Sequence, residues 1–400
     1  MRNVDAAGLG IGDDYPPRIM GVLNVSQESP YSPSVFADPG EAAAYVDHEL
    51  VDEGADIVDV GLESANKRLE VLTAEEELAR LDTAVEAIES VSGDAVFSIE
   101  TRYHEVAAEA LDRGFDVVND ICGFADPEMA RVCEERDAAV VKMASPPDLE
   151  RPGAVEETPW ADRRGEAWAD EADYVDQVYE ALKQHGFTEK TIVDPAFGGW
   201  SEAQTLADDR ETFCRLREFR ALGRPILVSI NRKNFLRQLA DRETEAALPV
   251  SLAATSMAVE RGAHVIRTHD VAETRDAALV GAAFARERVR DGGEIGVEEL
   301  DVTTRSEAER HLGDLDADAD DVAAATDRAV VRSFAFRGLA GVERGAIQAA
   351  TSGVNAQFVA GDGAGVLVGT RSGVRAVAES ASGISERLTA ALAALDDAFV

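Results

Sequence analysis

The sequence has 400 residues, 45% of them hydrophobic, which is ample for one large core and a smaller additional region. Its 77 acidic and 39 basic residues leave a formal charge of −38, which repels phosphate backbones and argues against a nucleic-acid partner. Only five of the basic residues are lysines, and this acid-rich, lysine-poor composition indicates adaptation to concentrated salt, where self-repulsion is screened.

Cysteine usage and the N-terminal residues both indicate the cytoplasm. Cys122, Cys133 and Cys214 show no CxxC spacing, so free thiols in a reducing compartment are expected rather than a structural zinc site. Residues 1–15 contain Asp and Gly where a signal peptide needs an apolar stretch. No window approaches the run of about eighteen apolar residues that spans a bilayer, so no membrane partner is expected.

An N-terminal segment, residues 1–17, precedes a repeated pattern that begins at Arg18. Short apolar runs alternate there with amphipathic stretches, as in consecutive βα units around a parallel sheet. Each run is nearly all apolar, as expected for strands buried on both faces. Eight runs predict an α/β fold, a TIM (β/α)8 barrel, with strands at Ile19–Val25, Ile57–Gly61, Val96–Glu100, Val117–Asp120, Ala139–Met143, Ile192–Asp194, Ile226–Ile230 and Val265–Arg267.

Amphipathic helices are predicted between these strands, with apolar residues at helical spacing and charges on the remaining face. Gly54, Gly114 and Gly262 each separate a helical run from an apolar one, where a left-handed residue commonly ends a helix. The clearest helices are predicted at Glu41–Glu53, Ala74–Ser90, His104–Arg113 and Trp168–His185.

The repeated pattern ends near residue 291. Residues 18–291 hold the eight units, and residues 292–400 are predicted to form a small acidic α+β appendage of unknown role. Within it, Gly361, Gly363 and Gly365 lack the Lys-Ser/Thr pair of a phosphate-binding loop, so they predict a turn between two strands.

Polar residues occupy the carboxyl ends of the predicted strands, which converge on one face of a parallel barrel and usually carry its chemistry. Carboxylates, amides and cations alternate there, so one polar site is expected. Its predicted members are Asn24, Glu63, Ser64, Glu100, Thr101, Asn119, Asp120, Lys142, Met143, Asp194, Asn231, Arg232, Lys233, Arg267 and His269.

Seven short sequence blocks occur at these strand ends. The blocks are Ile19-Met-Gly-Val-Leu-Asn-Val25, Asp56-Ile-Val-Asp-Val-Gly61, Ser98-Ile-Glu-Thr101, Asn119-Asp-Ile121, Asp194-Pro195, Asn231-Arg-Lys-Asn-Phe235 and Arg267-Thr-His-Asp-Val271. They resemble the signature blocks of the dihydropteroate synthase family. The resemblance spans about residues 18–288, in the same block order, and does not extend into the appendage.

The resemblance implies a transferase of folate biosynthesis that joins a dihydropterin diphosphate to an arylamine, by default p-aminobenzoate, and releases diphosphate. A pterin is flat and has a mixed donor and acceptor edge, which Glu100, Asn119 and Asp194 could match. By the same resemblance, Lys233 donates to the ring and Met143 packs on its face.

The diphosphate would contact Arg267 and His269, and would reach Asn24 through Mg²⁺, the implied cofactor. No protein nucleophile is required, so catalysis is expected to be electrostatic, with Asn24, Glu100, Lys233 and Arg267 as its residues. The family commonly forms homodimers through helices of the later barrel units, and a homodimer is therefore expected.

Some positions depart from the family pattern. Glu100 stands where the family has Asp, and its carboxylate is one methylene longer, which could alter pterin specificity. Asn234 replaces the usual Ser and stays a predicted substrate-binding residue. In the second loop the usual Thr-Arg pair is Ala-Asn, and Lys67 or Arg68 could restore the charge. The arylamine acceptor is therefore left open.

Two other functions are compatible with the same fold. A pterin-dependent methyltransferase module would share the planar pocket, but it has no diphosphate to bind, which Arg267 and His269 argue against. A repurposed or non-catalytic pterin-binding paralogue would explain the altered loops and the appendage.

Overall fold

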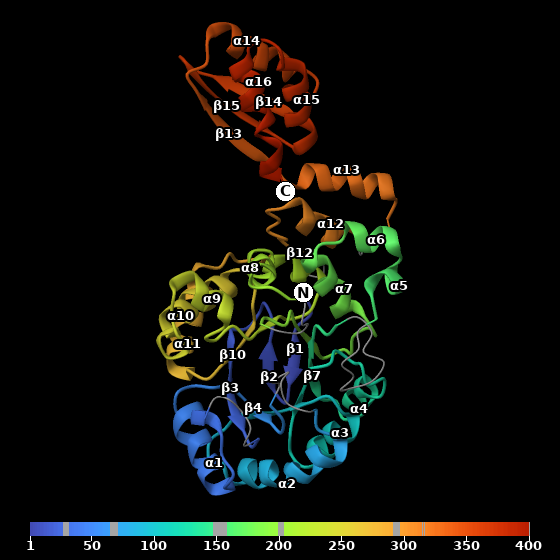
Figure 1. The fold of residues 1–400 in the computed structure, drawn as a ribbon, viewed down its shortest axis with the longest axis vertical. Coiled ribbons are helices and arrows are strands. Elements are labelled where there is room, and N and C mark those ends of the chain that lie inside the picture. Colours follow the sequence, from blue (N-terminus) through green and yellow to red (C-terminus); the bar gives the residue numbers. More distant parts are fainter. Residues whose placement is uncertain are drawn as a thin grey trace. The chain divides into compact units, whose positions relative to one another are not determined.

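The protein consists of two compact units, Met1–Glu298 and Glu299–Val400, and each has a hydrophobic core of its own (Figure 1). The first unit contains the eight βα units, and the second contains a small antiparallel sheet with helices. In this computed structural model the described residues are 1–26, 32–64, 71–146, 158–198, 204–290, 297–313, 315 and 317–399.

Eight parallel strands of the first unit form one sheet, which closes into a barrel. The strands pair in the order β8-β7-β6-β5-β4-β3-β10-β9, and a parallel bridge between Val193 and Ile226 joins the two ends of this order. The predicted TIM barrel is confirmed. Its strands are β3 (Arg18–Asn24), β4 (Ile57–Gly61), β5 (Val96–Thr101), β6 (Val117–Asp120), β7 (Ala139–Met143), β8 (Thr191–Asp194), β9 (Leu227–Val228) and β10 (Val265–Thr268).

Three of the predicted strands, β4, β6 and β7, coincide with the observed ones residue for residue. The largest difference is at β9, which is shorter than the predicted run Ile226–Ile230. Arg232 has a φ of +54°, so the chain turns toward the next helix soon after the strand.

Helices of the first unit surround the strands (Figure 1). Gly54, Gly114 and Gly262 have φ values of +101°, +103° and +104°, as predicted for residues that end helices. The predicted helix Trp168–His185 is interrupted because Asp173 caps a new helix. The helices are α1 (Pro39–Tyr45), η2 (Val46–Val51), α2 (Ala74–Ser90), α3 (His104–Asp112), α4 (Met129–Glu135), α5 (Trp160–Arg164), α6 (Glu166–Glu171), α7 (Tyr174–Lys183), α8 (Leu206–Cys214), α9 (Asn234–Ala240), α10 (Leu248–Glu260) and α11 (Val271–Phe284), with short 3-10 turns η1 (Ser32–Ser34), η3 (Leu216–Leu222) and η4 (Thr244–Ala246).

The N-terminal segment forms an antiparallel hairpin of β1 (Val4–Ala6) and β2 (Leu9–Ile11). Its buried side chains share one apolar cluster with residues at the amino ends of barrel strands, such as Ile57, Val117 and Val265. The hairpin therefore fills the amino end of the barrel, and the carboxyl end is the one that can receive a ligand. The unit ends with a pair of two-residue strands, β11 (Val289–Arg290) and β12 (Val297–Glu298).

The second unit contains a three-stranded antiparallel sheet in the order β13-β15-β14. The predicted glycine turn joins β14 to β15, and Gly363 has a φ of +67° there. Among the described residues, no helix of either unit has the length and apolar character that crossing a membrane requires. The elements of this unit are α12 (Arg305–Gly313), α13 (Ala319–Ala329), β13 (Arg332–Arg337), α14 (Gly341–Ala350), β14 (Ala356–Ala360), β15 (Ala364–Gly369), α15 (Arg371–Ala381), α16 (Glu386–Ala393) and η5 (Asp396–Phe399).

Candidate active site

Side chains alternate along a strand, so only every second residue at the carboxyl ends can face the barrel axis. Ile57, Val117 and Ile192 line the interior, and residues two positions further along the same strands therefore face inward as well. These inward-facing side chains form a ring, the mouth of the barrel. Members of the ring on neighbouring strands are paired in register. They are Asn24, Gly61, Glu100 and Asn119 on β3 to β6, and Met143 and Asp194 on β7 and β8.

A buried carboxylate, Asp59, connects four strands just below this ring. It accepts hydrogen bonds from Ser98 Oγ at 2.7 Å, Asn119 Nδ2 at 2.9 Å and Arg267 Nε at 2.7 Å. The side chain has no exposure to solvent. Asp59 was not among the predicted site residues, although a carboxylate in the middle of a strand buried on both faces is itself unusual enough to mark a polar site.

Arg267 lies between two carboxylates. Its Nη2 donates to Glu100 Oε2 at 2.7 Å, in addition to the bond from Nε to Asp59. Burial opposes the charge on the guanidinium, but Glu100 and Asp59 more than offset this, so the pKa of Arg267 is raised. Burial also raises the pKa of Glu100, against the effect of Arg267. The longer Glu100 side chain is thus held by an ion pair.

Lys233 and Asp194 carry opposite charges at the mouth and influence each other electrostatically. Burial raises the pKa of Asp194 to about 6, while a backbone N–H of Ala196 and the charge of Lys233 act against that rise. Burial lowers the pKa of Lys233, and Arg267 acts in the same direction. Within the described part of the chain, the Lys233 ammonium has no hydrogen-bond partner, so its donors remain available to a ligand.

Gly198 allows the loop after β8 to pack against the stem of Lys233. A Cβ at this position would lie 2.9 Å from Lys233 Cδ, and the φ of +81° is one that other residues rarely adopt. The Gly198 N–H also donates to Asp209 Oδ1 at 2.9 Å. The loop therefore fixes the direction in which the lysine side chain enters the mouth.

His269 and Asn234 complete the predicted substrate-binding residues. Burial, with a further contribution from Arg267, lowers the pKa of His269 to about 3, so its ring is neutral at ordinary pH and can offer directed hydrogen bonds rather than charge. Asn234 is exposed at the start of α9, and its Oδ1 accepts from Arg237 Nη1 at 2.9 Å. It therefore lies at the edge of the buried ring.

Asn24 is the predicted metal ligand. Its Nδ2 donates to Ser34 Oγ at 2.9 Å, and its Oδ1 lies where a Cβ on Gly61 would come within 2.8 Å. The amide is thus oriented with its oxygen in a space that only glycine leaves open. An amide oxygen is a ligand that Mg²⁺ accepts, with phosphate oxygens and waters as the others, so the residues present fit this ion.

Three predicted members do not face the mouth. Thr101 Oγ1 donates to Glu77 Oε2 on α2 at 2.5 Å, Asp120 accepts two backbone N–H groups of its own loop, and Lys142 donates to backbone carbonyls after α7. The expectation that all strand-end polar residues gather in one site was wrong for these residues. Strand alternation explains it, because each follows or precedes an inward-facing neighbour.

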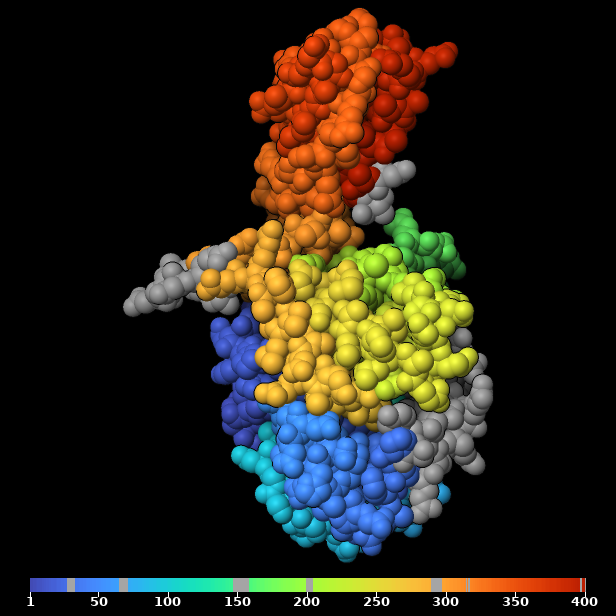
Figure 2. Space-filling view, turned by 90° about the vertical axis from the view of Figure 1, so that its left-hand side faces the viewer, coloured from blue at the N-terminus to red at the C-terminus, as the bar shows by residue number. Residues whose placement is uncertain are grey.

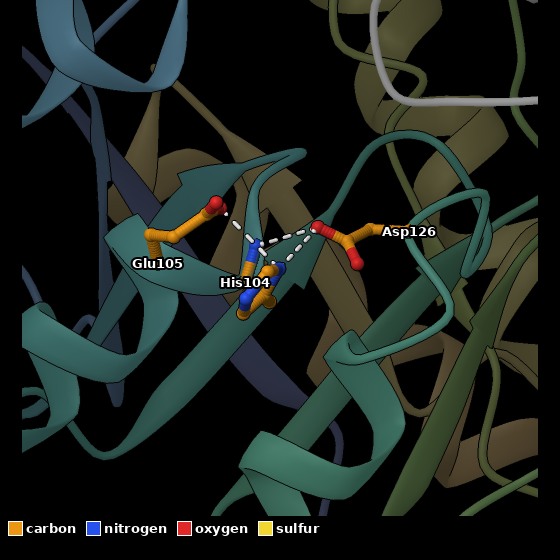
Figure 3. Close-up of side chains that lie close together, drawn as sticks. All are labelled: His104, Glu105 and Asp126. Carbon is orange, nitrogen blue, oxygen red and sulfur yellow. Dashed lines mark hydrogen bonds and ion pairs between the residues drawn. The ribbon is translucent and has the colours of Figure 1, made fainter.

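A separate polar cluster lies at the amino end of α3 (Figure 3). His104 Nδ1 is 2.8 Å from Asp126 Oδ2 and 3.3 Å from Glu105 Oε2, and the same Asp126 oxygen accepts the backbone N–H of His104 at 3.0 Å. Asp126 therefore caps the helix and orients the imidazole ring, and these roles explain the contacts of the cluster.

Several positions where the sequence departs from the family pattern lie outside the described residues. They are the Ala65-Asn66 pair of the second loop and also Lys67 and Arg68, which were named as replacements for its missing charge.

Comparison with known proteins agrees with this geometry. Residues 20–269 match the family described as pterin binding enzyme. Dihydropteroate synthase from Escherichia coli is 31% identical over 270 residues, which cover 66% of this chain and 90% of that protein. A probable bifunctional folylpolyglutamate synthase/dihydropteroate synthase from Haloferax volcanii is 35% identical over 292 residues, 70% of this chain. This chain spans only about a third of that relative, since the match covers 32% of its length.

Solved structures that are similar to this chain are also dihydropteroate synthases. Dihydropteroate synthase from Thermus thermophilus, in complex with 4-aminobenzoate, is 28% identical with a TM-score of 0.55, covering 71% of this chain and all of that one. The Coxiella burnetii enzyme in complex with pteroic acid is 28% identical with a TM-score of 0.55, covering 70% of this chain and 98% of that one. With a matching family over more than half its length and an inward-facing ring of the expected residues, the chain belongs to the pterin-binding enzymes of the dihydropteroate synthase family.

Proposed function

We propose that the chain condenses a dihydropterin diphosphate with an arylamine, by default p-aminobenzoate, and releases diphosphate. The observation that carries the proposal is the mouth itself, where Asn119, Asp194 and Lys233 surround the barrel axis above the Asp59–Arg267 pair. The relatives named dihydropteroate synthase, and a homologous structure that holds 4-aminobenzoate, support it.

The pterin ring is the part of the substrate that these residues recognise best. Its amino group and ring N–H need acceptors, which the Asp194 carboxylate and the Asn119 amide oxygen supply, while its carbonyl and ring nitrogens need donors, which Lys233 supplies. Asn119 Nδ2 is already oriented by Asp59 at 2.9 Å, so the amide oxygen points the other way. Met143 offers an apolar contact for the face of the ring.

The reaction needs no protein nucleophile. The lone pair of the arylamine nitrogen attacks the methylene carbon of the dihydropterin, the new C–N bond forms, and the C–O bond breaks with its electron pair leaving on diphosphate. One N–H proton is then lost to solvent. The side chains hold the pterin so that the methylene carbon faces the amine, which replaces a bimolecular encounter by a positioned one.

Mg²⁺ is the proposed cofactor, with Asn24 Oδ1 as its protein ligand. When bound, it would neutralise charge on the leaving diphosphate. Carboxylates outnumber cations among the described residues in and beside the mouth, so a polyanionic ligand needs additional positive charge there. The carboxylates are Asp59, Glu63, Glu77, Glu100 and Asp194, and the cations are Arg102, Lys233 and Arg267.

A homodimer is the proposed assembly, formed through α10 and α11. These helices expose Met257, Leu279, Val280 and Phe284, with exposed fractions from 46% to 79%. Figure 2 shows α9 to α11, coloured yellow to light orange, as one continuous surface of the barrel unit. Large exposed apolar side chains on neighbouring helices are typical of an association surface, in particular on an acidic protein.

We also infer the solvent and the compartment from the composition. We propose a cytoplasmic enzyme that works in concentrated salt, because a formal charge of −38 would otherwise destabilise a compact chain of this size. The proposed partners of the enzyme are its small-molecule substrates, which bind at the mouth.

The decisive experiment is turnover by the full chain in molar salt. Dihydropterin diphosphate and p-aminobenzoate are supplied with Mg²⁺ or with a chelator, and both diphosphate release and dihydropteroate formation are measured. We expect both products in equal amounts, and only with Mg²⁺. Tight binding of the pterin without diphosphate release would instead identify a non-catalytic pterin-binding paralogue.

A further inference from the structure

We propose that Arg102 is an additional anion-binding residue of the mouth and contacts the diphosphate of the substrate. The inference rests on the proposed function, since it assigns a further residue to the same site. Arg102 is not among the residues that the family blocks bring to the site, and it follows the Ser98-Ile-Glu-Thr101 block directly.

The position of Arg102 on the barrel brings its side chain to the mouth. It lies two residues after Glu100, just beyond the end of β5, and its side chain reaches Glu63, which follows β4. The Arg102 guanidinium is one of the charges that act on Glu100. Two guanidinium groups, those of Arg267 and Arg102, therefore stabilise the charged form of Glu100, and Arg267 also donates to it directly.

The Arg102 guanidinium is buried with only part of its hydrogen-bonding capacity used. Its Nη2 donates to Glu63 Oε2 at 3.0 Å, and its Nη1 is 4.0 Å from the sulfur of Cys122. The side chain is 11% exposed, and its Nε–H is buried without an acceptor among the described residues. A buried charged donor left without a partner is costly, so an additional acceptor from a ligand would be favourable there.

The ion pair with Glu63 does not by itself account for this arrangement. Neutralising Glu63 requires one or two donors, whereas a guanidinium has five N–H groups in a fixed plane. Glu63 is held independently, because its second oxygen accepts the backbone N–H of Leu72 at 3.2 Å. Glu63 thus fixes the direction of Arg102 and leaves the Nε side for an oxyanion.

The two substrates carry different anions, a diphosphate and the carboxylate of p-aminobenzoate. The diphosphate is attached to the reacting methylene carbon, whereas the carboxylate lies across the benzene ring from the reacting nitrogen. Arg102 is buried and acts on Glu100, which belongs to the ring around the barrel axis. A cation at that depth is close to the reacting carbon, so the diphosphate is the anion that it fits.

The test compares Arg102→Met and Arg102→Lys with the full wild-type chain in molar salt and Mg²⁺. The matched control is Arg113→Met, which removes the same charge from an arginine paired with Asp82 on the outer surface. Calorimetric titration measures binding of inorganic diphosphate, of p-aminobenzoate, and of the hydroxymethyl dihydropterin that lacks diphosphate. Near-ultraviolet circular dichroism checks that each variant keeps its tertiary packing.

We expect Arg102→Met to weaken diphosphate binding by about tenfold, the effect of one lost charged hydrogen bond, with the other two ligands unchanged. Arg102→Lys should recover part of the loss, and Arg113→Met should bind like wild type. An unchanged diphosphate affinity, a loss confined to p-aminobenzoate, or an equal loss for all three ligands would overturn the assignment. Turnover by wild type is a separate readout: without it the proposed function fails, while diphosphate binding still decides the role of Arg102.

Discussion

Arg267 Nε donates to Asp59 Oδ2 across 2.7 Å, at a point where Asp59 has no contact with solvent. The same carboxylate orients Asn119, and the same guanidinium holds Glu100. Two residues predicted to bind the pterin are therefore positioned by one buried ion pair, which neither of them belongs to. The pair couples the stability of the barrel to the geometry of the mouth.

Asp59→Asn should destabilise the protein and weaken pterin binding together. The change removes the more deeply buried of the two carboxylates that pair with the Arg267 guanidinium, and breaking such a buried pair typically costs about 3 kcal/mol or more. Urea unfolding in molar salt measures the stability. Asp82→Asn is the control, because it removes a carboxylate from an exposed pair with Arg113 and should leave the unfolding midpoint unchanged. Equal midpoints for both variants would contradict the proposed coupling.

Lys233→Met should weaken binding of the pterin ring by about tenfold or more, because it removes the buried cation whose donors are available to a ligand. Fluorescence titration with hydroxymethyl dihydropterin isolates the ring from the diphosphate. Lys183→Met, at the exposed end of α7, removes a lysine outside the mouth and should bind like wild type. Wild-type affinity in Lys233→Met would remove Lys233 from the site.

The barrel could be predicted because strands buried on both faces leave a simple signal. Asp56 and Asp116 directly precede the runs at Ile57–Gly61 and Val117–Asp120, so the starts of these strands were clear. Strands of three residues, such as Val4–Ala6 of the hairpin, carry too few alternations to be recognised.

The members of the site were harder to predict than the strands. Searching only past the strand ends excluded Asp59, which lies in the middle of β4, and included Lys142, which faces the helices. Applying the two-residue period inside each strand would have found the first and rejected the second. Arg102 could not be assigned in this way, because its role depends on the partner that orients it.

Glu77→Gln should change how stability depends on pH. Burial raises the pKa of Glu77 to about 7, although the hydrogen bond from Thr101 acts against this. A carboxyl group with a raised folded-state pKa stabilises the fold fully below its unfolded pKa of about 4.3, and loses that contribution as pH rises toward 7. Since Gln resembles the neutral acid, the variant should match wild type near pH 4 and be more stable near pH 8, by up to about 3 kcal/mol.

Urea unfolding of both proteins at several pH values measures the difference for Glu77. Glu76→Gln is the neighbouring control, because Glu76 lies on the exposed side of the same helix turn and its carboxylate accepts the backbone N–H of Thr73 at the start of α2. The Glu76→Gln variant should be slightly less stable than wild type at neutral pH, which is the opposite of the effect expected for Glu77→Gln. Parallel pH profiles for wild type and Glu77→Gln would show that Glu77 is charged in the folded protein throughout this range.

Phe284→Glu should convert the proposed homodimer into monomers. Phe284 ends α11 and is 79% exposed, and in an interface through α10 and α11 it would be buried against the partner subunit. A charge there would be desolvated without a partner, which usually costs more than a standard interface can tolerate. Sedimentation velocity in molar salt should give a dimer for wild type and a monomer for the variant. Val342→Glu is the matched control, since Val342 is 67% exposed on α14 of the other unit. If Val342→Glu alone dissociated the assembly, the contact would lie on the second unit instead of on the barrel helices.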